Sequence, residues 1–118
     1  MIKVKFKLTR KDRTSCLIHP KSQFCKRYLK DAIVEAEPGT PGIFIYKTRR
    51  QAEGYARYWN KDWLILRVEP IGLGKVPRKV SYAITQRSII SFIKKLASMH
   101  TMSPPEGTIC YPAVRVLD

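Results

Sequence analysis

The N-terminal segment 2–8 alternates strictly between apolar and lysine side chains. The apolar positions are Ile2, Val4, Phe6 and Leu8, and the cationic positions are Lys3, Lys5 and Lys7. A period of two is the repeat of a β-strand, in which successive side chains point to opposite faces. The segment therefore predicts a strand with one buried face and one cationic face, in a fold that supplies a sheet for it to join.

The charge of the chain is large and concentrated near its start. The first thirty residues hold ten Lys or Arg side chains against one acid, Asp12, and the whole chain is formally +14. Residues 31–46 carry three acids and no base. Such an excess costs self-repulsion, which a polyanionic partner or a phosphate-bearing ligand normally offsets. A hydrophobic fraction of 44 % argues against a disordered basic tail. We therefore expect a folded protein with a basic patch built chiefly by its N-terminal third.

Length and cysteine content favour a single domain, residues 1–118, in a reducing compartment. No run approaches the roughly 20 apolar residues that cross a bilayer. The N-terminus also lacks the continuous apolar block of a signal peptide. Three widely spaced cysteines are a poor disulfide framework. We expect free thiols, no membrane contact and a cytoplasmic location.

The remaining pattern predicts several short strands separated by turns. The loop 37–42 contains two prolines and two glycines. Strands or hairpin arms are expected at 16–18, 24–29, 32–36, 43–46 as a central strand, 63–68 ended by Pro70, 80–83, and 109–117 interrupted by Pro112 at an edge or bulge.

Two helices are expected between these strands. Thr48 and Gln51 have the spacing of a capping box, and Ala52, Tyr55 and Ala56 follow at helical spacing, which predicts a helix over 49–60. A wide apolar stripe predicts a second helix over 86–99. The chain is therefore expected to be α+β, with a mixed or antiparallel sheet of about five to six strands covered by two helices.

The basic N-terminal residues are candidates for phosphate binding. Alternate lysines of a strand recur at roughly 6.6 Å, close to the phosphate spacing of a single strand, and Tyr28 or Phe24 could provide a stacking face. The alternative is a solvated strand face whose lysines discourage edge-to-edge aggregation. The candidate residues of this region are Lys3, Lys5, Lys7, Arg10, Lys11, Arg13, Lys26, Arg27, Tyr28 and Lys30.

Three further cations surround the start of the expected first helix: Lys47, Arg49 and Arg50. Cations at a helix N-terminus oppose the helix dipole, and a bound phosphate would relieve this. The alternative is that they are simply exposed first-turn residues.

Metal binding and catalysis have weaker signals. Cys16, His19 and Cys25 could contribute to a zinc site, but zinc needs four converging ligands, and cysteines in apolar runs are ordinary core residues. The pair Glu35 and Glu37 resembles the acidic motif of ADP-ribosyltransferases, although it precedes the strands that such a fold needs first. We expect no cofactor and no enzymatic activity.

Several short strings in the chain resemble a group of small uncharacterised proteins of bacteriophage and other viral genomes. The strings are Ser15-Cys16, Cys25-Lys26-Arg27-Tyr28, Pro38-Gly39-Thr40, Gly42-Ile43-Phe44-Ile45, Thr48, Ala52, Tyr55, Arg67-Val68-Glu69-Pro70-Ile71-Gly72, Pro104-Pro105-Glu106-Gly107-Thr108 and Tyr111-Pro112-Ala113-Val114. The resemblance covers most of the chain and implies a viral accessory protein in the host cytoplasm, with no particular activity.

Two functional hypotheses follow from the charge. The first is a non-enzymatic accessory protein that binds DNA or RNA through phosphate contacts, with little sequence specificity. The second is a counter-defence factor that sequesters a phosphate-bearing small molecule, such as a nucleotide signal, or inhibits an acidic host protein. A polymer binder and a nucleotide binder differ in whether a small ligand alone stabilises the protein.

Overall fold

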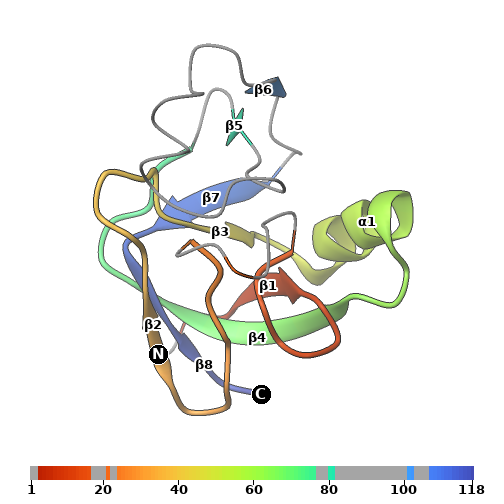
Figure 1. Cartoon of the computed structure of the whole chain (residues 1–118), viewed down its shortest axis with the longest axis horizontal. Coiled ribbons are helices and arrows are strands. Elements are labelled where there is room, and N and C mark those ends of the chain that lie inside the picture. Colours follow the sequence, from red (N-terminus) through yellow and green to blue (C-terminus); the bar gives the residue numbers. More distant parts are fainter. Residues whose placement is uncertain (1–2, 17–20, 22–23, 77–79, 82–100, 103–106) are drawn as a thin grey trace.

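The computed structural model describes residues 3–16, 21, 24–76, 80–81, 101–102 and 107–118. Over these residues the chain is α+β, with a six-stranded antiparallel sheet and one helix (Figure 1). The elements are β1 (Lys5–Thr9), β2 (Ile33–Glu35), β3 (Ile43–Tyr46), α1 (Arg49–Trp59), β4 (Leu64–Ile71), β5 (Val80–Ser81), β6 (Thr101–Met102), β7 (Thr108–Tyr111) and β8 (Ala113–Val116).

The six-stranded sheet is strongly curled. Its strand order is β2-β8-β4-β1-β3-β7, so β7 and β8 lie four strands apart in the order. Four strand spacings in a flat sheet are about 19 Å, whereas the chain from Tyr111 to Ala113 spans at most about 7 Å. The sheet must therefore bend until its ends approach, and Pro112 lies at the bend between the two strands, both blue in Figure 1.

The concave face of the sheet holds the larger core cluster. Alternate residues of β3, β4 and β8 point inward, as the period of two requires. The buried residues of this cluster are Tyr28, Val34, Ile43, Ile45, Leu66, Val68, Val114 and Val116. Within the part of the chain that is described, the curl encloses this apolar interior and no helix packs on that side.

Helix α1 covers the opposite face of the sheet near β1 and β3. Ala52 and Ala56 pack against Leu8 and Tyr46. The helix is capped as predicted, because the Thr48 hydroxyl accepts from the Gln51 amide and the Gln51 side chain accepts from the Thr48 amide. The predicted helix 49–60 is confirmed, whereas the predicted helix 86–99 lies outside the described residues.

Of the predicted strands, 43–46 is present with the predicted limits, and several others are present with changed limits. The segments 32–36, 43–46 and 109–117 correspond to β2, β3 and the β7–β8 pair. Residues 24–29 form no strand, and contribute only an isolated bridge from Arg27 to Thr14. Of 16–18 only Cys16 is described, and of 80–83 only the β5 residues.

The prediction that Pro70 ends its strand is wrong, since β4 continues to Ile71. The Leu117 amide donates to the Arg67 carbonyl, so by alternation the even-numbered positions of β4 direct their amides toward β1. Strand β1 begins at Lys5, opposite Val68. Pro70 lies beyond that end, where its missing amide costs no ladder bond.

Candidate anion-binding surface

The predicted row of lysines on β1 does not form an exposed face. Lys3 is exposed, Lys5 is half-buried, and Lys7 is only 8 % exposed. The Lys7 ammonium donates to the Phe44 carbonyl at 3.0 Å and lies 5.2 Å from the centre of the Tyr28 ring. The apolar face of β1 packs under the helix, so its lysine face turns toward the inside of the curl. Lys7 is therefore a structural cation, and its prediction as part of a solvent-exposed row is wrong.

The prediction that Tyr28 offers a stacking face to a nucleic acid is also wrong. Its side chain is 2 % exposed and belongs to the enclosed core cluster. A ring at this depth cannot stack on a nucleic-acid base. Among the described residues, no buried side-chain nitrogen or oxygen lacks a hydrogen-bond partner, so this interior presents no unpaired polar group to a ligand.

Three more of the predicted cations bind groups of the protein itself. Arg10 donates to the Ser15 carbonyl at 2.7 Å. Arg13 donates through Nε to the Tyr28 carbonyl at 2.7 Å and through Nη2 to the main-chain oxygen of Asp118. The Lys26 ammonium forms an ion pair with Glu37. These half-buried side chains tie the N-terminal turns to the rest of the fold.

A further group of N-terminal cations lies on what we term the turn surface, residues 10–15 and 26–31. The two segments are joined by main-chain bonds from Ser15 to Lys26 and from Tyr28 to Arg13. Its exposed cations are Lys11, Arg27 and Lys30.

The turn surface also carries an acid, Asp12. Hydrogen bonds from the Thr14 hydroxyl and amide hold the pKa of this carboxyl below its usual range, and the positive charges of Arg10 and Arg27 act in the same direction. Asp12 therefore stays ionised, and it reduces the net charge of the turn surface.

Helix α1 carries a second basic surface, which the sequence interpretation found only in part. Residues 47–61 contain five Lys or Arg side chains and one acid, Glu53. Arg50 and Arg57 lie seven residues apart on the side of the helix opposite the buried Ala52 and Ala56, and Lys61 follows in the turn after the helix. We term this surface the α1 ridge; its exposed members are Lys47, Arg49, Arg50, Arg57, Tyr58 and Lys61.

The α1 ridge differs from the turn surface in how its cations are partnered. Among the described contacts, one ion pair involves the ridge, between Arg49 and Glu53 at 3.4 Å, and both side chains are about half exposed to water. Tyr58 is 79 % exposed and directly follows Arg57 in the helix. Gly54 lies between Arg50 and Tyr58, and a Cβ built there meets no atom within 4 Å. The ridge is thus an open cationic surface with an aromatic side chain.

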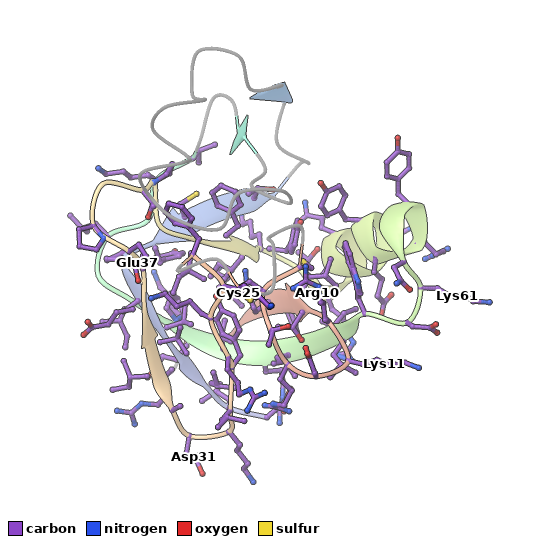
Figure 2. The ribbon with its side chains drawn as sticks, in the orientation of Figure 1. Arg10, Lys11, Cys25, Asp31, Glu37 and Lys61 are labelled. Carbon is purple, nitrogen blue, oxygen red and sulfur yellow. The ribbon has the colours of Figure 1, made fainter. Side chains whose placement is uncertain are left out.

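A hollow of about 210 Å³ lies between α1 and the start of β4. It is lined by Glu53, Ala56, Arg57, Lys61, Trp63 and Ile65. The pairing of Thr9 with Leu64 places the turn after β1 beside the turn that precedes β4. Accordingly, Lys11 and Lys61 project from the same end of the molecule in Figure 2. Trp63 packs against the core cluster of Leu8 and Tyr46 and also lines this surface hollow.

The cysteines do not form a metal site within the part of the chain that is described. The Cys16 thiol donates to the Leu8 carbonyl at 3.4 Å, and Cys25 lies 3.9 Å from the Arg10 guanidinium. His19 lies outside the described residues. No group of three or more His, Cys, Asp or Glu side chains that are described could hold a metal ion. Burial raises the pKa of Cys16, and that of Cys110 to about 12, which keeps both thiols protonated at neutral pH.

Comparison of the chain with protein-family models, curated proteins and solved structures gives no match. Within the described residues no helix has the length and apolarity needed to span a membrane. Function has to be argued from the charge and geometry of the chain itself.

Proposed function

We propose that this chain is a non-enzymatic protein that binds nucleic acid through phosphate contacts along the α1 ridge, with the exposed cations of the turn surface as a secondary contact. The observation that carries the proposal is the charge left over after internal pairing. The chain has 23 Lys and Arg side chains and 9 Asp and Glu side chains, so its own acids can neutralise only a minority of its cations. A polyanion supplies the missing negative charge.

The α1 ridge supports this proposal better than the turn surface does. An exposed cation keeps its hydration and its freedom to meet a phosphate, whereas a cation bonded to a carbonyl or a carboxylate must first break that contact. The long axis of the helix, about 16 Å for its 11 residues, offers several phosphates a cation in succession. Low sequence specificity is expected, because phosphate contacts position a strand without reading its bases.

A titration of fluorescent DNA and RNA at increasing salt tests the proposal. Three to five phosphate contacts predict a logarithmic slope of about −2 to −3.5 for single strands. Gly54→Glu places a carboxylate in the middle of the ridge, where there is open space, and should weaken binding about tenfold or more. Gly54→Gln is the matched control, since it adds a side chain of the same size without charge. A slope near zero, or equal losses in the two variants, would refute the proposal.

The viral origin, the location in a host cytoplasm and the inhibition of an acidic host protein stay predictions from charge and resemblance. The capture of a free nucleotide, the other hypothesis, depends on the hollow beside the ridge and is taken up with it.

A further inference from the structure

The hollow between α1 and β4 is lined by apolar, cationic and acidic side chains. Its floor is apolar and aromatic, formed by Ala56, Trp63 and Ile65. Its rim carries two cations, Arg57 and Lys61, which also belong to the α1 ridge. One acid, Glu53, completes the lining.

Local geometry explains why these residues meet. Glu53, Ala56 and Arg57 are three or four residues apart, so they share one side of the helix. Trp63, which precedes β4, and Ile65 in β4 are two residues apart, and both pack against the same core cluster. The turn that contains Lys61 connects the helix to the strand. The described lining of the hollow thus comes from one helix–turn–strand unit.

We infer that this hollow receives one nucleobase, stacked on Trp63, with the attached phosphate held by Arg57 and Lys61. The inference rests on the proposed function and deepens it, because it names a nucleotide with an unpaired base as the ligand. A volume of about 210 Å³ is below the range of drug-sized pockets, and fits a single planar ring system. A base inside a duplex is paired and stacked, and cannot enter. The protein should therefore prefer single strands to duplexes.

Glu53 gives the hollow a preference among bases. Its carboxylate accepts hydrogen bonds but cannot donate them when ionised. Cytosine carries an exocyclic amino donor, whereas thymine has a carbonyl oxygen at the same position. Short oligodeoxycytidine should therefore bind more tightly than oligothymidine of equal length. The ion pair of Glu53 with Arg49 is solvent-exposed at 3.4 Å, and does not prevent a second contact.

The fluorescence of Trp63 reports on the inference directly. The chain has two tryptophans, so Trp59→Phe leaves Trp63, which lines the hollow, as the single reporter. Oligodeoxycytidine should quench its emission, and should bind about three- to tenfold more tightly than oligothymidine. Glu53→Gln should remove this preference while keeping the affinity for oligothymidine. The double variant Arg57→Gln with Lys61→Gln should weaken the binding of both oligonucleotides. The control, Lys75→Gln with Arg115→Gln, removes the same charge elsewhere on the protein and should weaken binding less.

Free cytidine 5′-monophosphate and cytidine distinguish a strand from a small nucleotide as the source of the ligand. If the monophosphate quenches Trp63 at about 1 mM or less and cytidine does not, the nucleotide assignment of the hollow is supported even without polymer binding. If oligonucleotides bind with a steep salt dependence but leave Trp63 emission unchanged, the inference is overturned and the proposed function stands. If neither polymers nor the monophosphate bind, both fail.

Discussion

The cations of the N-terminal third and those of helix α1 carry the same charge but have different roles in the fold. Lys7, Arg10, Arg13 and Lys26 bond to carbonyls or to a carboxylate of the protein. The cations of the α1 ridge are exposed to water. The density of charge in a sequence segment is therefore a poor guide to a binding surface. What matters is whether the fold brings oxygen acceptors to each cation.

The largest expected effect is on stability and comes from Lys7. Lys7→Ala removes a buried side chain and leaves the Phe44 carbonyl without its donor, which should lower the free energy of unfolding by about 2–4 kcal/mol. Urea denaturation measures this. Lys3→Ala, at an exposed position of the same lysine face, is the control and should change stability by less than about 0.5 kcal/mol. Similar values for both variants would show that Lys7 is not a structural cation.

The second effect separates binding from folding. Arg57→Gln with Lys61→Gln should reduce the salt slope of single-strand binding by about 1.4, and leave stability nearly unchanged. Arg13→Gln with Lys26→Gln removes the same charge but breaks internal contacts, so it should lower stability by about 1–3 kcal/mol with a smaller change in slope. Fluorescence anisotropy and urea denaturation on both proteins decide this. The reverse pattern would place the binding surface in the N-terminal turns.

A smaller effect on stability is expected at Gly54, because glycine has a low helix propensity and lies in the middle of α1. Gly54→Ala should raise the free energy of unfolding by about 0.5–1 kcal/mol, because the glycine is exposed in mid-helix and an added Cβ meets nothing within 4 Å. Thermal and urea denaturation measure the gain. A loss of stability would mean that this face of α1 packs against another part of the chain, and would remove the ridge as an open surface.

The smallest effect concerns Asp118 and depends on pH. Hydrogen bonds from the Arg67 side chain and amide hold the pKa of this carboxyl below its usual value of about 3.8. An acid whose pKa is lowered in the folded state stabilises the fold at pH values above its ordinary pKa. This stabilisation is lost as the pH falls through the lowered pKa. Asp118→Asn should therefore cost about 0.2–1 kcal/mol at pH 7, because the pair is largely exposed, and progressively less as the pH falls below about 4. A difference independent of pH would exclude this ion pair as its cause.

Local patterns in the sequence were informative where a single element explains them. The capping box at Thr48 and Gln51 and the buried Ala52 and Ala56 define α1 without reference to the rest of the chain. The alternation in β1 correctly separates Phe6 and Leu8 from the lysines. In each case the signal is a periodicity or a hydrogen bond between residues close in sequence.

The candidate site was harder to predict, since it depends on pairs of elements. Arg57 and Lys61 belong to no sequence motif. They become part of a candidate site only because the chain folds back after α1 and brings Trp63 into the same hollow. Tyr28 was expected to face solvent, and instead fills the interior of the curled sheet. Pro70 was expected to end a strand, yet it lies where no partner strand needs its amide.

By itself, the sequence determined the α+β class, the capped helix and a charge of +14 that the protein's own acids cannot balance. These properties follow from composition and from short-range spacing. Tertiary structure decided which cations remain available, because only the curl of the sheet brings carbonyls, carboxylates and aromatic rings to some of them and leaves those of α1 in water. The physical reason is that a hydrogen bond or ion pair between residues distant in sequence needs the whole chain to be folded before its partners meet.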